Sequence, residues 1–149
     1  MPSARLMCAA SGHDADLLYA THFYADDPFV WWEARGRTHV ALSPLEIDRA
    51  GPIARAQVHA IGEFSEKNSS PAAVIPGIAA KYKIISFLVP EQFPAGLLET
   101  LRTKGLRITV SHEPFFPQRV RKTGEEVRKL TAALRVAEAG LRRGIDVLR

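Results

Sequence analysis

Histidines and carboxylates are the side chains of this sequence that could bind a metal ion or move protons. The five histidines are His13, His22, His39, His59 and His112. No two of them share one predicted helix or strand at a spacing typical of metal ligands. Asp14 and Asp16 precede an apolar run and fit better as turn and helix N-cap residues. His39 and His59 lie in predicted strands, where a hydrogen-bonded structural histidine is the common outcome. The spacing therefore predicts no metal centre within this chain.

Nucleophilic and phosphate-binding motifs are also missing from the sequence. Cys8 is the single cysteine and lies in the apolar run LMCAA, which is typical of a buried core thiol. One cysteine cannot form an internal disulfide, which favours a reducing, cytoplasmic location. The chain contains neither a dinucleotide-binding glycine pattern nor a Walker motif, and no serine lies in a nucleophile elbow. These absences argue against nucleotide binding and against a catalytic triad.

Two adjacent tryptophans, Trp31 and Trp32, lie in a predicted strand. Successive side chains of a strand point to opposite faces of the sheet. We therefore expect one indole in the core and the other partly exposed, as part of a contact surface.

The elements that must position these side chains alternate between strand and helix patterns. Strands are predicted at 5–10, 28–43 (a pair joined by a tight turn at Arg35-Gly36), 57–64, 83–90 and 106–111. Helices are predicted at 45–56, 71–82, 94–105 and 125–149. Short loops between alternating patterns indicate an α/β sandwich, and the strand pair at 28–43 makes its sheet mixed. The pattern changes to one long helix after about residues 117–121.

Composition places the chain among globular proteins. Its 149 residues are 46% hydrophobic, which suffices for a buried core. The net charge is +4: residues 117–149 carry nine Lys or Arg against four Asp or Glu, whereas residues 1–116 carry eleven against twelve. No aromatic residue is interleaved with those charges, so we read them as a solvated helix face and expect no nucleic acid partner. No stretch is long and apolar enough for a membrane span, and we expect no membrane partner.

The last 25 residues form a strongly amphipathic pattern. Apolar side chains recur at steps of three and four, which draws one stripe along a helix. The stripe consists of Val127, Leu130, Leu134, Ala137, Leu141, Ile145 and Leu148. Glu125 and Glu126 begin the helix, where its dipole favours acidic side chains. The pattern predicts a helix with one face meant for burial, and the sequence alone leaves open what that face contacts.

Two segments resemble the N-terminal domain of the creatinase, prolidase and aminopeptidase P family. In that family the final segment reads approximately R-x-x-K-x-x-x-E-[IV]-x-x-[IL]-x-x-A. Arg119, Lys122, Glu126, Val127, Leu130 and Ala133 match these positions. An earlier family motif, N-x-x-Y-[LV]-[ST]-G-[FW], is matched by Tyr19, Thr21 and Phe23. Asp16, Ala20 and His22 replace its asparagine, aliphatic residue and glycine.

The resemblance implies a fold and a division of the chain. It implies a three-layer α/β sandwich with a mixed sheet, similar to ribonuclease H, followed by a long C-terminal connecting helix. Residues 1–118 would be the creatinase-like N-terminal domain, and residues 119–149 the helix leading towards a catalytic domain. In the family that domain is a pita-bread fold that holds two divalent metal ions, such as manganese, cobalt or zinc. None of its ligand positions falls within these residues, so we expect no cofactor and no catalytic residue in this chain.

The function implied by the resemblance is that of an accessory domain. The parent protein would be a hydrolase that cleaves Xaa-Pro bonds, with proline-containing peptides as substrates, while the 149 residues alone would be inactive. The domain would shape the substrate entrance and the dimer contact. Its partner would be a catalytic domain of the same polypeptide or of a second subunit, within a homodimer. The substrate-entrance candidates are Tyr19, His22, Phe23, Asp26, Asp27 and Trp32.

The sequence leaves two alternatives open. The chain could be a self-standing binding or dimerisation module with the same fold and no catalytic partner. It could also be the N-terminal domain of a creatinase-type amidinohydrolase, because the replacements at Asp16, Ala20 and His22 weaken any inference about one particular substrate.

Overall fold

The computed structural model describes residues 3–66 and 69–148. The chain divides into two compact units, Met1–Phe115 and Phe116–Arg149, which we call unit 1 and unit 2. Among the described residues, no helix is both long enough and apolar enough to cross a membrane.

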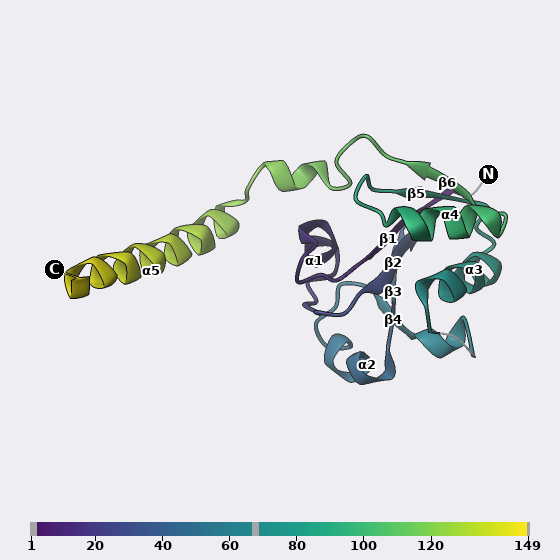
Figure 1. Ribbon diagram of the computed structural model, residues 1–149, viewed down its shortest axis with the longest axis horizontal. Helices are drawn as coiled ribbons and strands as arrows, with labels where there is room; N and C mark the ends of the chain where they lie inside the picture. The colour runs from purple at the N-terminus through teal and green to yellow at the C-terminus, as the bar shows by residue number, and fades with distance from the viewer. Residues whose placement is uncertain (1–2, 67–68, 149) are drawn as a thin grey trace. The chain divides into compact units, whose positions relative to one another are not determined.

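Unit 1 is built on one six-stranded mixed sheet, drawn in Figure 1. The strands are β1 (Ser3–Ala9), β2 (Phe29–Ala34), β3 (Arg37–Leu42), β4 (Gln57–Ala60), β5 (Ser86–Val89) and β6 (Arg107–Val110). Their order across the sheet is β4-β3-β2-β1-β5-β6. Strand β2 pairs antiparallel with both β1 and β3, whereas the β3/β4, β1/β5 and β5/β6 pairs are parallel. The predicted mixed sheet is confirmed.

Helices lie on both sides of this sheet. They are α1 (Ala15–Thr21), α2 (Pro44–Ala50), α3 (Pro71–Tyr82) and α4 (Ala95–Thr103). Helices α1 and α2 lie on one side of the sheet, and α3 and α4 lie on the other (Figure 1). Proline occupies the first turn of α2 and of α3, where its missing N–H costs no helical hydrogen bond. The arrangement is the predicted three-layer α/β sandwich.

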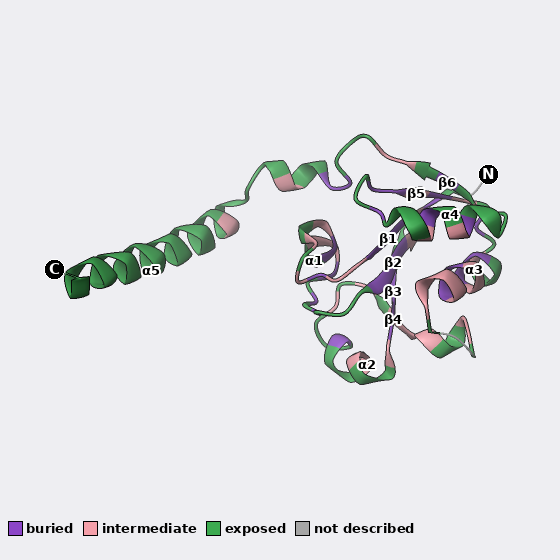
Figure 2. Ribbon diagram, viewed as in Figure 1, coloured by how far each residue is buried: buried purple, intermediate pink, exposed green. Residues whose placement is uncertain are grey.

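The central strands are buried on both faces, as Figure 2 shows in purple. Val30, Trp32 and Ala34 of β2 belong to the core beneath α3 and α4. Trp31 points to the opposite face, and both indoles are 0% exposed. The expectation that one tryptophan would be partly exposed is therefore wrong, because helices and loops cover both faces of β2. Cys8 is also buried in this core, as predicted for a core thiol.

Strands β2 and β3 are joined by a two-residue hairpin turn at Arg35 and Gly36, as predicted. Ala34 pairs with Arg37 in the register of the two strands. Both turn residues have positive φ, 53° for Arg35 and 71° for Gly36. This combination is typical of a type I′ turn, whose backbone twist matches that of the flanking strands.

Several element boundaries differ from the sequence prediction. The predicted helix at 45–56 ends at Ala50, because Gly51 and Pro52 interrupt it. The predicted strand at 57–64 is split into β4 and a 3₁₀ turn, η1 (Ile61–Glu63). Helix α1 has only 7 residues and was not predicted as a separate helix.

Unit 2 consists of a 3₁₀ turn, η2 (Pro117–Val120), and the helix α5 (Gly124–Leu148) of 25 residues. A capping box begins α5. The Glu126 carboxylate accepts hydrogen bonds from the backbone N–H and the hydroxyl of Thr123, at 2.7 and 2.9 Å. Thr123 Oγ1 in turn accepts from the Glu126 N–H at 3.2 Å. The predicted long C-terminal helix is confirmed, and none of its residues is buried.

Candidate functional site

The loop predicted to border a substrate entrance runs from helix α1 to strand β2. Asp14 caps the N-terminus of α1, and its side chain accepts a hydrogen bond from the Leu17 N–H at 2.8 Å. This is the N-cap role that the sequence predicted. His22 ends the helix with a left-handed backbone, at φ 53°. The αL region at a helix C-terminus is the usual place for glycine, so His22 adopts a backbone conformation that is less favourable for a residue with a Cβ.

The entrance candidates of this loop are distributed between core and surface. Phe23 is completely buried and packs edge-on against Phe29, with ring centroids 6.0 Å apart. Tyr19 is half-buried, whereas His22, Asp26 and Asp27 are exposed. Phe23 therefore anchors the loop, and the polar side chains form an exposed rim, which we call the α1 rim.

Two small polar residues that the sequence prediction missed hold this loop in place. Ser11 Oγ accepts a hydrogen bond from the Ala25 N–H at 2.8 Å and donates to the Phe23 carbonyl at 2.7 Å. Thr21 Oγ1 donates to the Leu17 carbonyl at 2.8 Å. Both side chains are buried, and these bonds satisfy backbone groups that would otherwise be costly to bury.

Trp32, the sixth entrance candidate, lies apart from the α1 rim. Its indole stacks on the His39 ring at 5.0 Å between centroids and an interplanar angle of 9°. Phe64 and Tyr82 contact the same indole edge-on, each at 5.5 Å. Because Trp32 is fully buried in this aromatic group, it presents no surface of unit 1.

The structure brings two histidines together that the sequence treated as separate. His39 of β3 and His59 of β4 point to the same face of the sheet, because Ala41, two residues after His39, pairs with His59 in the parallel register. His39 Nδ1 lies 3.2 Å from His59 Nε2. His59 Nδ1 lies 3.3 Å from Glu63 Oε2. The prediction of hydrogen-bonded strand histidines is confirmed.

Two residues of helix α3 complete this polar group, which we call the histidine cluster: His39, His59, Glu63, Lys81 and Tyr82. Lys81 Nζ donates to Glu63 Oε2 at 2.8 Å. The Tyr82 hydroxyl lies 3.4 Å from His59 Nε2. No sequence spacing could have revealed the cluster, because its members come from β3, β4, η1 and α3.

The cluster shifts the pKa values of two of its members. Burial, together with the positive charges of His59 and Arg37, lowers the pKa of His39 below its usual 6.5. The hydrogen bond from Lys81 is the main cause that lowers the pKa of Glu63 below 4.5. At neutral pH the cluster therefore contains a neutral His39 imidazole and an ionised Glu63 carboxylate.

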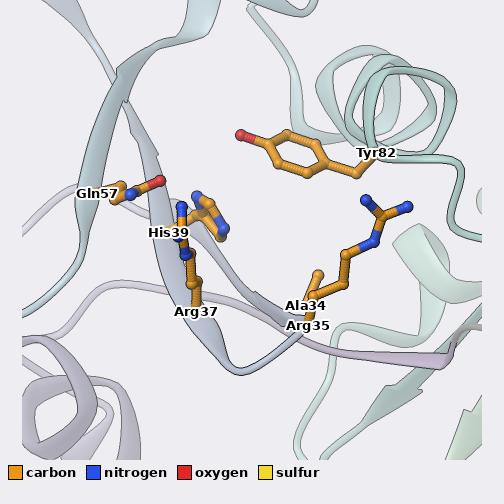
Figure 3. A pocket seen from close by; sticks show the side chains of 6 residues that line it. All are labelled: Ala34, Arg35, Arg37, His39, Gln57 and Tyr82. Atoms are coloured by element: carbon orange, nitrogen blue, oxygen red, sulfur yellow. The ribbon is translucent and has the colours of Figure 1, made fainter.

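A pocket of about 390 Å³ opens beside His39. It is lined by Ala34, Arg35, Arg37, His39, Gln57 and Tyr82, as Figure 3 shows. We call it the hairpin pocket, since the turn between β2 and β3 supplies both arginines. Its walls can donate hydrogen bonds and provide positive charge.

Metal binding is not supported in the described part of the chain. Among residues 3–66 and 69–148, no group of three His, Cys, Asp or Glu side chains could hold a metal ion. The Cys8 thiol is also unsuited to act as a nucleophile, because burial raises its pKa to about 11. What the described side chains can do is hold a proton between two histidines and bind an anion at the arginines.

Comparison with solved structures identifies the class of fold. The chain is similar to the prolidase from Pyrococcus horikoshii OT3 (TM-score 0.76, 15% identity), over 97% of this chain and 38% of that one. It is similar to the X-Pro aminopeptidase from Thermotoga maritima MSB8 (TM-score 0.80, 13% identity), over 99% of this chain and 42% of that one. No protein-family model and no curated protein matches the sequence.

A third similarity is to a separate domain. It is the creatinase/prolidase N-terminal domain of an X-Pro dipeptidase from Streptococcus pyogenes (TM-score 0.52, 11% identity), over 73% of this chain and 82% of that one. The chain thus has the fold of creatinase/prolidase N-terminal domains, as the sequence resemblance implied. It spans about two fifths of the length of the prolidase and the aminopeptidase.

Proposed function

We propose that this chain is the non-catalytic N-terminal domain of a metal-dependent Xaa-Pro peptidase of the aminopeptidase P or prolidase type. One observation carries the proposal. The similarity to a prolidase and an X-Pro aminopeptidase extends over 97% and 99% of this chain but over 38% and 42% of theirs. The remaining length of those proteins leaves room for a separate catalytic domain.

In this proposal the chemistry takes place outside the 149 residues. A catalytic domain would hold two divalent metal ions, whose role in hydrolysis is to activate water and polarise the scissile carbonyl. The described residues of this chain do not fit such a centre, because they contain no group of three metal-binding side chains. We therefore assign no catalytic step to them.

The role left for this domain is to shape the substrate entrance and the dimer contact. The α1 rim is our candidate for the entrance, because His22, Asp26 and Asp27 are exposed while Phe23 anchors the loop beneath them. The partner would be a catalytic domain of the same polypeptide or of a second subunit, in a homodimer. We place the enzyme in the cytoplasm, since a lone buried cysteine suits a reducing compartment.

The proposal is tested by isolating the protein from its native source through a tag placed at residue 1. We expect a polypeptide longer than 149 residues, or a tightly bound second subunit, that hydrolyses Xaa-Pro peptides with added Mn²⁺. The matched Xaa-Ala peptides should be cleaved far more slowly. Residues 1–149 produced alone should show no hydrolysis with manganese, cobalt or zinc.

Other outcomes would contradict the proposal in distinct ways. Hydrolysis of creatine instead of peptides would identify a creatinase-type amidinohydrolase. A 149-residue product without a partner and without hydrolysis would identify a self-standing module. Turnover by residues 1–149 alone, with two tightly bound metal ions, would show that the assignment as a non-catalytic domain is wrong.

A further inference from the structure

The hairpin pocket has the size of a small-molecule site. Its volume of about 390 Å³ exceeds what one ion needs and falls at the lower end of the range, roughly 300–1,000 Å³, typical of ligand pockets. Every residue that lines it belongs to unit 1. Its lining comes from the end of β2, the turn, β3, β4 and the end of α3, so a rigid sheet and a helix fix its shape.

The charge of the pocket has one sign. Arg35 and Arg37 are its charged lining residues, and no acidic residue lines it. Three other arginines of unit 1 have carboxylate partners: Arg5 with Glu33, Arg49 with Glu46, and Arg102 with Glu99. Within residues 3–66 and 69–148, the guanidinium groups of Arg35 and Arg37 make no hydrogen bond or ion pair, although the backbone of Arg37 pairs with Ala34 in the sheet. Two guanidinium groups at one pocket repel each other unless an anion lies between them.

The backbone at Arg35 is unfavourable for arginine. A type I′ turn needs positive φ at both central residues, for which asparagine and glycine are preferred. Arg35 adopts φ 53°, a backbone conformation that costs about 1–2 kcal/mol for residues other than Gly, Asn or Asp. An arginine therefore occupies this turn position despite an unfavourable backbone conformation. Figure 3 shows its guanidinium group directed towards Tyr82, and the Arg37 side chain beside His39.

Neutral donors complete the walls, and the ring of His39 is held in place. Gln57 and Tyr82 offer an amide and a hydroxyl group. His39 is fixed by its stacking on Trp32 and by its contact with His59. The negative charge of Glu63 lies against the opposite nitrogen of His59 and is paired with Lys81. No carboxylate of the histidine cluster therefore cancels the positive charge at the pocket.

From these observations we infer that the hairpin pocket binds a small oxyanion, that is, a ligand with a phosphate or carboxylate group. The planar, multidentate donors of Arg35 and Arg37 match the oxygens of such groups. Gln57 and Tyr82 hydrogen-bond the remainder of the ligand. This site is independent of the proposed peptidase function, since it requires no residue outside unit 1.

The inference is tested by NMR titration of the ¹⁵N-labelled 149-residue chain. Sodium phosphate and sodium succinate are added in separate arms, with sodium chloride used to keep the ionic strength constant. We expect saturable shifts of the amide signals of Arg35, Arg37, His39 and Gln57. Saturation by phosphate alone identifies a phosphate ligand, saturation by succinate alone identifies a carboxylate ligand, and saturation by both supports the general class.

Matched variants separate a site from general attraction of anions. Arg35→Gln and Arg37→Gln should each weaken binding about tenfold, the effect of losing one charge-assisted hydrogen bond. Arg107→Gln is the control, because it removes the same charge from an exposed position of strand β6 outside the pocket. This control should change the affinity less than about twofold. Arg35→Gly removes the side chain while suiting the positive φ, so it gives a folded variant if Arg35→Gln fails to fold.

Three results would overturn the inference. One is a set of shifts that grow linearly with both anions and never saturate. Another is equal binding by the wild-type chain, the Arg35→Gly variant and the Arg37→Gln variant. A loss of affinity in Arg107→Gln as large as in the pocket variants would likewise show that net charge, not the pocket, attracts the anion.

Discussion

His39 Nδ1 and His59 Nε2 face each other at 3.2 Å across strands β3 and β4. Two ring nitrogens at this distance share one proton, because one must donate and the other accept. Glu63 Oε2 accepts from His59 Nδ1 and so keeps a proton on that nitrogen. Because only one of the two facing nitrogens can carry a proton, the four ring nitrogens of the pair hold at most three protons. The pair can therefore carry no more than one positive charge while the contact persists.

This relationship predicts that acid destabilises unit 1 through His39. Its pKa is lowered by burial, by His59 and by Arg37, whereas in the unfolded chain it returns to about 6.5. Well above pH 6.5, His39 is neutral in both the folded and the unfolded chain, so it adds no pH dependence to stability. Below pH 6.5, His39 binds a proton in the unfolded chain but not yet in the folded chain. The free energy of unfolding should fall by at most about 1.4 kcal/mol per pH unit down to the lowered pKa.

Urea unfolding between pH 8 and pH 5.5 measures this effect. That range avoids Glu63, whose lowered pKa means that its stabilising contribution is lost only as the pH falls below 4.5. His39→Phe keeps a ring on Trp32 but cannot titrate, so its stability should depend less on pH. His112→Gln is the control, since that side chain is 87% exposed. An identical pH slope in the His39→Phe variant and the wild-type chain would contradict the prediction.

Gly77 of α3 is predicted to be intolerant of substitution. A Cβ built there would lie 2.0 Å from the Phe64 carbonyl oxygen, a backbone atom that cannot rotate away. Gly77→Ala should therefore cost at least about 2 kcal/mol, the scale of overpacking in a core. Gly96→Ala in α4 meets no atom within 4 Å and should instead stabilise by about 0.5–1 kcal/mol. Thermal unfolding of both variants checks the pair, and equal effects would refute this account of the α3–Phe64 contact.

The sequence predicted most of the fold because apolar periodicity and turn residues are local signals. The hairpin at Arg35-Gly36, the mixed sheet and the capped helix α5 could be read in this way. The burial of both Trp31 and Trp32 could not, since strand alternation does not show whether the outer face is covered by a second layer of helices. The end of α2 at Ala50 was missed, although Gly51-Pro52 is a recognisable stop signal.

The candidate sites were harder to predict than the fold. His39 and His59 were correctly read as strand residues, but their contact depends on the parallel pairing of β3 with β4, which no sequence pattern specified. The roles of Ser11 and Thr21 were missed because short hydroxyl side chains give no periodic signal. The positive φ of Arg35 could have been predicted in part. The sequence predicts a tight turn at Arg35-Gly36, and such turns usually have Asn-Gly, with positive φ at both residues.

Ser11 is predicted to stabilise the loop beneath the α1 rim through its buried hydroxyl group. Ser11→Ala would leave the buried Ala25 N–H without its hydroxyl partner, while the Phe23 carbonyl would keep only the longer contact from Thr21 Oγ1 at 3.3 Å. An unsatisfied buried group costs about 1–3 kcal/mol, and the free energy of unfolding should fall by that amount. Asp27→Ala, an exposed change in the same loop, should alter it by less than about 0.5 kcal/mol. Urea unfolding distinguishes the two, and a neutral Ser11→Ala variant would show that the loop is held in another way.

If the α1 rim borders a substrate entrance, its exposed polar residues should affect substrate binding more than stability. His22→Asn tolerates the left-handed backbone, so the fold should be retained. If the parent protein is the Xaa-Pro peptidase proposed above, we expect His22→Asn and Asp27→Ala to raise its KM for Xaa-Pro peptides several-fold with little change in kcat. Glu99→Ala on α4, another exposed carboxylate change, is the control. An unchanged KM in both rim variants would exclude the rim from the entrance.

The apolar stripe of α5 yields the last prediction. Leu141, Ile145 and Leu148 are 67%, 42% and 89% exposed, and burying each would be worth ~1.5–3 kcal/mol. The residues of the core cluster all lie between Ala4 and Ile108, so this part of α5 is not needed to complete it. Deleting residues 141–149 should therefore leave the melting temperature almost unchanged while reducing self-association through the stripe.

Circular dichroism melts and sedimentation velocity measure the two effects on the same samples. Arg142→Ala with Arg143→Ala changes the polar face of the same helix and should leave the association state as it is. Gly140 and Gly144 lower the intrinsic stability of this stretch, so fraying of the last turns competes with association. A large loss of melting temperature with an unchanged association state would show that the stripe belongs to the folded core of this chain. That result would favour a self-standing module, because a connecting helix needs a second domain or subunit to bury its apolar face.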